Sequence, residues 1–591
     1  MKLAWHNTLM KPKAPLSHLI LDSLDEFRLQ TAKPDALIQL SLLALLVGLI
    51  TGATIVAFIV LIDTSLSLWL PGNATENFED LPHLSRFIAP VLGSLLISVV
   101  YIAIAKPGHS VGVVNVIERL RYHEGYLRLR AFILQFIGAI IALASGHSMG
   151  REGPSIHIGG FVGSYFSQII GLPNNAMRTL VACGVAAAIS AAFNTPLAGV
   201  IFAMEIIILE YTFSSFIPII ISAVAATGIS RTYLGDDLIF VTESIPSLSL
   251  SEIPFVILLG VLVGIASTIF TTTIRVTTHL TQSLNFSIRF MIAGLVTGSI
   301  AVFVPQIMGL GYDTLNSAIL GELSTSLLFV ILVAKLLATA ISVGCSIPAG
   351  LIGPSLVIGA VGGSFMALFL HHTLEIPIEN ISLYALIGMS AMMGACLQAP
   401  LAALTAVFEI TAHHAVIWPS MLAIVIAQLI CRQLFKQPPV FDLLLHIRGL
   451  DFNEYPITQS LQRTGIAKAM NRDFRLLTQI TTLNEVKEAI KHNPQWICIM
   501  QDKQPAGLLR GIDLIQHLEK NQSEDSINLL QIPAKRLQIE TIDIRATLAK
   551  TREIFNKNNA EALCITHWNV NATRYIYGVI TRDQFEELYM R

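Results

Sequence analysis

Long apolar runs separated by short polar segments dominate the first 450 residues of the chain. A helix needs about 20 residues to cross the roughly 30 Å hydrocarbon core of a bilayer. The runs that approach or exceed this length cover residues 36–70, 86–105, 129–145, 254–280, 289–305, 324–344 and 416–435. The pattern therefore predicts an all-α, polytopic membrane domain.

Glycine and proline interrupt four further apolar stretches, at residues 146–171, 181–209, 346–371 and 384–411. Irregular backbone at membrane depth is tolerated only where it is buried in protein or lines a cavity. We therefore expect helices that stop inside the membrane.

Composition changes after residue 450. Hydrophobic residues make up 53% of the chain and charged residues 13%, whereas a soluble domain is about 25% charged. The charged share is about one in ten before this point and about a quarter after it. We expect an N-terminal segment (1–34), a transmembrane domain (35–450) and a soluble tail (456–591). The composition argues against a soluble enzyme, and the net charge of −2 gives no reason to expect a nucleic-acid partner.

Basic residues predict the orientation of the first two spans. Lys and Arg are concentrated in the N-terminal segment and in residues 106–130, whereas residues 71–85 between them are acidic. Basic loops stay on the cytoplasmic side. We therefore expect an integral protein of the plasma (inner) membrane with both termini in the cytoplasm.

The chain contains an internal repeat. GPSIHIGGFVGS (153–164) matches GPSLVIGAVGGS (353–364), and PLAGVIFAMEI (196–206) matches PLAALTAVFEI (400–410) in the same order. Two halves with broken helices are typical of transporters built as inverted repeats, whose sites lie where half-helices meet. Helix N-termini that point inward would favour an anion there.

A charged pair interrupts one broken stretch. Gly150-Arg151-Glu152-Gly153-Pro154 places Arg151 and Glu152 at membrane depth, where ionisable side chains are costly and usually functional. A carboxylate beside an anion path competes with the anion when charged and withdraws when protonated. The alternative is a structural Glu–Arg pair at a helix end.

These motifs resemble those of the CLC family of chloride channels and chloride/proton exchangers. GREGP (150–154) matches one family signature, and GHSVG (108–112) and AGLIGP (349–354) stand where two others are expected. The resemblance extends over about 35–591 and implies a homodimer in the lipid bilayer, with one chloride pathway per subunit and Glu152 as the gate. The anion-binding positions that it implies are His109, Ser110, Arg151, Gly153, Leu351, Ile352 and Phe441.

Two departures from the family pattern affect the anion site. His109 stands in place of a serine, with Ser110 one position later. Phe441 stands where the family commonly has a tyrosine and so lacks a hydroxyl donor. The choice between chloride, nitrate and fluoride therefore stays open.

A third departure affects proton coupling. In many exchangers an inner glutamate carries the proton, and Ile206 occupies that position here. An isoleucine cannot carry a proton, so we favour a channel-like protein. The alternative is chloride/proton exchange by a route from Glu152 through Glu205, Glu210, His109 or water.

The tail contains two similar units, WICIMQDKQPAGLLRGIDLIQHL (496–518) and ALCITHWNVNATRYIYGVITRDQFEEL (562–588). Each reads as two strands followed by a helix, which resembles an α+β tandem CBS pair. In that family a Thr-x-x-Asp motif can bind the ribose of an adenine nucleotide. Thr581, Asp583 and Asp513 match the motif incompletely, and a purely structural dimerisation module is the alternative. We expect no required cofactor and no metal site.

Two other protein classes account for less of the sequence. GHSMG (146–150) and GHSVG (108–112) fit G-x-S-x-G, which in a serine hydrolase follows a strand and precedes a helix. A membrane-length apolar run precedes the first match, so we expect no enzyme. A receptor with a simple membrane anchor would leave the repeat and the Arg151–Glu152 pair unexplained.

Overall fold

A computed structural model of the chain describes most of the sequence and divides it into two compact units. The described residues are 27–28, 30–31, 36–73, 76–105, 110–209, 211–235, 248–374, 380–450, 461, 464–502, 504–520, 526–568 and 574–589. The larger unit comprises Leu37–Ile170 and Met177–Phe452, and the smaller comprises Asn453–Arg591 with Met1–Ala36 and Gly171–Ala176. His109, Glu210 and the predicted boundary at 450–456 lie outside the described residues, apart from residue 450.

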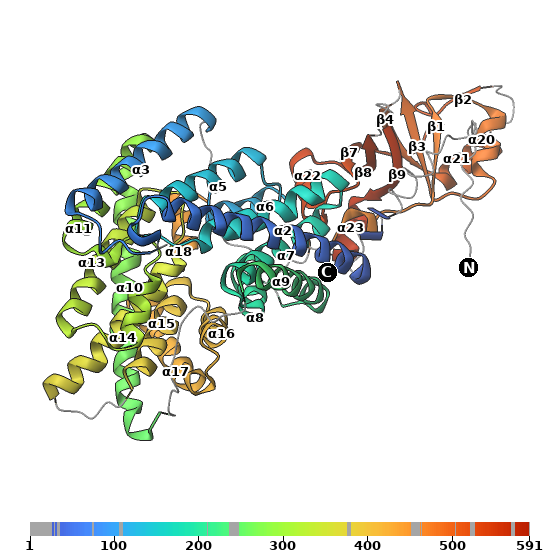
Figure 1. The fold of residues 1–591 in the computed structure, drawn as a ribbon. Helices are drawn as coiled ribbons and strands as arrows, with labels where there is room; N and C mark the ends of the chain where they lie inside the picture. The colour runs from blue at the N-terminus through green and yellow to red at the C-terminus, as the bar shows by residue number, and fades with distance from the viewer. Residues whose placement is uncertain are drawn as a thin grey trace. The chain divides into compact units, whose positions relative to one another are not determined.

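The larger unit is built of helices joined by loops over its described residues (Figure 1). Among these residues, nine helices are long and apolar enough to cross a membrane. The α-helices of this unit are α2 (Leu37–Ser67), α3 (His83–Ile104), α4 (Val113–Tyr122), α5 (Leu129–Ala144), α6 (Glu152–Ile170), α7 (Asn174–Phe193), α8 (Pro196–Phe202), α9 (Phe213–Leu234), α10 (Ile253–Thr281), α11 (Phe286–Phe303), α12 (Tyr312–Ile319), α13 (Thr325–Gly344), α14 (Ile352–Leu374), α15 (Ile381–Leu397), α16 (Pro400–Thr411), α17 (Ile417–Leu429) and α18 (Val440–Ile447).

The predicted all-α membrane domain is confirmed, but the predicted runs do not all correspond to membrane-length helices. The run at 129–145 forms α5, a helix of 16 residues. The stretch at 181–209 is divided between α7, which is long enough to span, and the shorter α8 with the π-helix η2 (Ala203–Ile208). The spanning helix α9 was not predicted, because Pro218 and several Ser and Thr residues dilute its apolar pattern.

The sequence repeat corresponds to two similar helix pairs. α6 packs against α7 where a Cβ on Gly159 would lie 2.1 Å from the Gly184 carbonyl oxygen, and α14 packs against α15 where a Cβ on Gly359 would lie 2.3 Å from that of Gly388. Real Cβ atoms essentially never approach so closely, so larger residues would separate the helices. The repeated glycines thus set the spacing of both pairs.

The breaks between helices are also repeated. Asn194 and Gln398 adopt left-handed backbone conformations (φ 59° and 52°), and each is followed two residues later by a proline that starts the next helix. A left-handed residue ends a helix, and proline is favoured at the first helical position. The local sequence therefore explains why α7 and α15 end before α8 and α16 begin.

The smaller unit contains an α+β tail. Its strands form three sheets, with the orders β1-β3-β4-β6, β2-β5 and β7-β8-β9. The elements are β1 (Phe474–Thr478), β2 (Ile480–Thr482), α20 (Leu483–Ile490), β3 (Trp496–Gln501), β4 (Gln504–Arg510), α21 (Gly511–Lys520), β5 (Ser526–Asn528), β6 (Arg536–Leu537), β7 (Ile539–Asp543), α22 (Leu548–Asn558), β8 (Ala562–Trp568), β9 (Arg574–Thr581) and α23 (Arg582–Tyr589).

The two tail modules share one plan. In each, a parallel strand pair (β1 with β3, β7 with β8) is extended by an antiparallel strand, β4 or β9. Each module has its own apolar core, and a third cluster joins Cys498 and Leu508 of the first to Cys564 and Val579 of the second. This arrangement is compatible with the predicted CBS pair, which stays a prediction.

Candidate functional site

Two matching loops meet in the middle of the larger unit. The backbone N–H of Gly150 donates to the carbonyl of Gly350, and the N–H of Gly350 donates back, both at 2.7 Å. A Cβ on Gly153 would lie 2.7 Å from Gly350 Cα, so only glycine permits this approach. α6 begins directly after the first loop and α14 directly after the second.

Glu152 bridges the two halves at this junction. Its side chain is 1% exposed. One carboxylate oxygen accepts the N–H of Gly353, in the first turn of α14, at 3.0 Å, and the other accepts the hydroxyl of Tyr312 at 2.5 Å. Backbone N–H groups at a helix N-terminus and hydroxyl groups are the donors that an anion uses. The carboxylate therefore occupies a position with the donors of an anion site.

Arg151 lies beside this bridge and contacts Tyr312. Its guanidinium donates to the carbonyl of Ala192 at 3.1 Å and stands 5.5 Å from the centre of the Tyr312 ring. Arg151 is absent from the described lining of the large cavity considered next. Its predicted contact with an anion stays a prediction.

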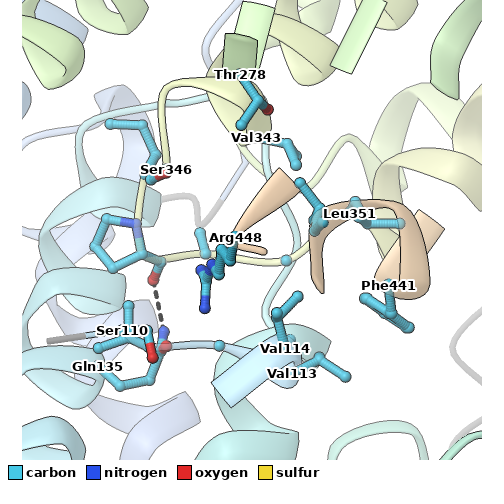
Figure 2. Close-up of a pocket in the computed structure, with 18 of the residues that line it drawn as sticks. Ser110, Val113, Val114, Gln135, Thr278, Val343, Ser346, Leu351, Phe441 and Arg448 are labelled. Atoms are coloured by element: carbon cyan, nitrogen blue, oxygen red, sulfur yellow. Dashed lines mark hydrogen bonds between the residues drawn. The ribbon is translucent and has the colours of Figure 1, made fainter. Parts of the chain in front are cut away.

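A cavity of about 560 Å³ brings together five of the predicted anion-binding positions. Ser110, Gly153, Leu351, Ile352 and Phe441 line it, although they come from distant parts of the sequence. In the view of Figure 2, Arg448 lies between Ser110 and Phe441.

The hydroxyl of Ser110 is already engaged. It accepts the side-chain N–H of Asn115 at 2.6 Å and donates to Glu118 at 3.2 Å, and the same Glu118 oxygen lies 3.5 Å from Arg448. A serine hydroxyl has one proton. Ser110 must therefore release Glu118 before it can donate to an anion.

Two arginines that the sequence analysis missed line the cavity, and one of them, Arg448, is paired there with Glu118. The other is Arg289. The guanidinium of Arg289 donates to Ser346 at 2.6 Å and to the carbonyl of Gly344 at 3.2 Å, so it also holds the loop that leads to α14. Gln135 supports the same loop by donating to the carbonyl of Pro348 at 2.7 Å (Figure 2).

A buried lysine positions the helix that carries Tyr312. Lys335 is 0% exposed, and its ammonium group donates to the carbonyls of Ile307 (3.0 Å), Gly309 and Leu310 (both 3.4 Å). These carbonyls belong to the loop that precedes α12. The signal that could have identified Lys335 is its charge in the middle of the apolar run 324–344, because ionisable residues there are usually functional.

Two carboxylates lie near Asp313, the residue that follows Tyr312 in α12. One Glu76 oxygen accepts the backbone N–H of Asp313 at 3.0 Å. Burial raises the pKa of Glu76 to about 7, and the negative charge of Asp313 adds to the rise. Burial likewise raises the pKa of Glu79 to about 7, again with a contribution from Asp313.

The predicted proton-pathway residues lie at crossed helix ends. The Glu205 carboxylate accepts the N–H groups of Leu401 (3.3 Å) and Ala402 (2.7 Å) at the start of α16. Its repeat counterpart, Glu409, accepts those of Leu197 (3.0 Å) and Ala198 (2.7 Å) at the start of α8. Each carboxylate thus caps the start of a helix that belongs to the other half of the repeat.

Ile206, next to Glu205, is 7% exposed and lies within the π-helix η2. The structure therefore places an apolar side chain at the position where many exchangers are expected to have a glutamate.

The GHSMG segment does not form a hydrolase elbow. It follows the helix α5, whereas the elbow requires a preceding strand. The hydroxyl of Ser148 is 3.0 Å from that of Thr339, and the neighbouring His147 ring contacts Ser94. These contacts leave no histidine base on Ser148 among the described residues.

In the tail, Thr581 caps a helix. Its hydroxyl accepts the N–H of Gln584 at 3.3 Å, and the Gln584 side chain accepts the N–H of Thr581 at 3.3 Å. Asp583 and Asp513 lie in the first turns of α23 and α21. Nucleotide binding at these positions stays a prediction.

Comparison with known proteins confirms the family resemblance. A family model described as voltage gated chloride channel matches residues 93–432. A putative ClcB-like chloride channel protein of Ralstonia nicotianae is 29% identical over 371 residues, covering 61% of this chain and 86% of that protein. The H(+)/Cl(−) exchange transporter ClcA of Vibrio vulnificus is 28% identical over 327 residues, covering 54% and 70%.

Solved structures show the same fold. A slow cyanobacterial Cl−/H+ antiporter aligns with a TM-score of 0.62 and 23% identity, over 70% of this chain and 98% of that one. A eukaryotic CLC transporter aligns with a TM-score of 0.58 and 17% identity, over 93% of this chain and 98% of that one.

Proposed function

Because the chain belongs to the voltage-gated chloride channel family of anion transporters, we propose that it carries chloride or a similar anion through one pathway per subunit, closed by Glu152. The observation that best supports this proposal is the position of the Glu152 carboxylate, which takes the donors Gly353 N–H and Tyr312 hydroxyl. An anion arriving from the large cavity needs donors of this kind.

Opening follows from the charge of Glu152. While charged, its carboxylate holds both donors through charge-assisted hydrogen bonds. Protonation removes that charge, weakens both contacts and frees the donors for the anion. Arg289 provides positive charge that draws an anion into the cavity, whereas the charge of Arg448 is paired with Glu118, which also lines the cavity.

We propose a channel-like pathway first, because Ile206 cannot carry a proton. Chloride/proton exchange is the second candidate, and the name of the ClcA relatives as exchange transporters favours it. In that case the proton must take a route other than Ile206.

The test uses purified protein in liposomes with an imposed chloride gradient, recording chloride efflux and internal pH together. Uphill proton movement identifies an exchanger, whereas chloride flux with protons at equilibrium identifies a channel-like pathway. Glu152→Gln mimics the protonated gate, so we expect high flux that no longer depends on pH. A pH dependence unchanged by this substitution would exclude Glu152 as the gate.

We also propose that the protein is a homodimer in the inner membrane with cytoplasmic termini, that it is not an enzyme and that it requires no cofactor. The resemblance supports the dimer and the basic segments support the orientation. Adenine-nucleotide binding by the tail is a separate proposal.

A further inference from the structure

The large cavity contains a positive charge without a carboxylate partner. Among its described lining residues, Glu118, Arg289 and Arg448 are the charged ones. Glu118 and Arg448 form an ion pair, with 3.5 Å between oxygen and nitrogen. Arg289 donates instead to the carbonyl of Gly344 and the hydroxyl of Ser346, and no carboxylate in the described part of the chain pairs with it.

The position of Arg289 makes the missing partner costly. The residue is 9% exposed and lies in the first turn of α11. A buried charge is unfavourable unless an opposite charge offsets it. The positive end of the helix dipole also lies at the start of α11, where it disfavours a cation and favours an anion. Arg289 therefore needs a counterion, and the cavity beside it can hold one.

The hydrogen bonds of the guanidinium show how an anion would contact it. Both bonds are made by Nη2, at 3.2 Å to the Gly344 oxygen and 2.6 Å to the Ser346 hydroxyl, which uses both of its hydrogens. Nη1 makes no hydrogen bond to any described residue. A planar oxyanion binds two nitrogens on one edge of a guanidinium. With Nη2 occupied, a compact halide on Nη1 fits better.

Ser346 lines the same cavity (Figure 2) in a strained backbone conformation. Its φ is 64°, in the left-handed region that costs a residue other than glycine free energy and is often retained for function. Its counterpart in the repeat is Gly146, with φ 78°. The two loops share their backbone bonds, since Gly146 N–H donates to Leu143 and Ser346 N–H donates to Val343. The second half thus keeps a serine where glycine would be unstrained.

The hydroxyl of Ser346 is a second donor beside the guanidinium. Its oxygen accepts Nη2 of Arg289 at 2.6 Å, and its own proton has no acceptor among the residues that the structure describes. A serine hydroxyl can accept one hydrogen bond and donate another. Arg289 and Ser346 therefore bring a positive charge and a free hydroxyl proton together on the cavity wall.

We propose that Arg289 and Ser346 form an additional halide site in the large cavity, separate from the predicted anion positions at Ser110 and Ile352. The bound halide is the counterion of Arg289. The inference deepens the proposed function and rests on the proposed anion pathway. The cavity volume of about 560 Å³ greatly exceeds the roughly 30 Å³ that a water molecule occupies, so two anions fit within it.

The experiment is crystallography of the full chain in bromide, with anomalous difference maps. We expect a bromide peak beside Arg289 Nη1 and the Ser346 hydroxyl. Ser346→Gly suits the left-handed backbone but removes the donor, so occupancy at subsaturating bromide should fall by about tenfold. The control is Ala412→Gly, which makes the same kind of exchange at another left-handed residue (φ 55°) outside the described lining, and it should keep the wild-type peak.

Three results would overturn the site. One is wild-type protein with bromide at Ser110 or Ile352 but none at Arg289. Another is an undiminished peak in Ser346→Gly. The third is displacement of the bromide by an equal concentration of nitrate, which would identify an oxyanion site. Transport is tested separately, because wild-type protein that moves no chloride in liposomes refutes the proposed function whether or not bromide binds at Arg289.

Discussion

The hydroxyl of Tyr312 provides the sharpest test of how the gate is held. Tyr312→Phe removes the donor at 2.5 Å from Glu152 and leaves the ring in place. A hydrogen bond to a charged group contributes about 1.5–3 kcal/mol, and 1.36 kcal/mol corresponds to a factor of ten. The charged, closed arrangement should therefore become about 10–100-fold less favoured.

This change has a definite sign on the pH axis. The bond stabilises the charged form, so its loss favours the protonated, conducting form at lower proton concentration. We expect the pH of half-maximal chloride flux to rise by about one to two units. The assay is chloride efflux from liposomes buffered at a series of pH values.

Tyr384→Phe is the matched control. The Tyr384 hydroxyl also donates to a carboxylate, that of Glu252, at 3.0 Å, and neither residue contacts Glu152. This variant should keep the wild-type midpoint. A Tyr312→Phe midpoint that coincides with wild type, in protein that transports normally, would refute the proposal that Tyr312 holds the gate closed.

Two further substitutions test neighbouring contacts. In Gly353→Ala, the added Cβ would lie 2.9 Å from both Glu152 carboxylate oxygens. We therefore expect the Glu152 side chain to be displaced and chloride flux at high pH to rise by about tenfold. The control is Gly362→Ala, where the atom nearest to the added Cβ is 3.6 Å away, and this variant should leave flux unchanged. Glu76→Gln removes a carboxyl whose pKa is raised to about 7. Because of that rise, the free energy of unfolding of the wild type decreases as pH increases from about 4.5 to 7. In the variant this decrease should be smaller by about 1–2 kcal/mol, after allowance for partial exposure. The measurement is thermal unfolding in detergent, with Asp80→Asn as the control.

The sequence motifs predicted the repeat and pointed to Glu152 because both are local patterns. GREGP identifies Glu152, and the two GPS blocks identify the paired helices whose glycines cross at 159–184 and 359–388. The same motifs predicted five positions that line the large cavity. His109 lies outside the described residues, so its predicted contact with an anion stays a prediction.

The contacts that complete the site could not be predicted in the same way. Tyr312 is 160 residues from Glu152, and nothing in its neighbourhood indicates that partner. The N–H groups of Leu197 and Ala198 donate to Glu409, which is more than 200 residues away, and only the folded arrangement reveals this contact. Lys335 could have been predicted, because an isolated charge within an apolar run usually marks a functional residue.

The crossed caps at Glu205 and Glu409 also constrain how the protein is made. Ala198 emerges from the ribosome 211 residues before Glu409, its partner. At the usual synthesis rate of about 5–20 residues per second, this interval is about 10–40 s. Throughout that time the first turn of α8 lacks its acceptor, and the Gly150–Gly350 bridge cannot form. The first half therefore stays incompletely folded in the membrane until the second half has been synthesised and both contacts can form.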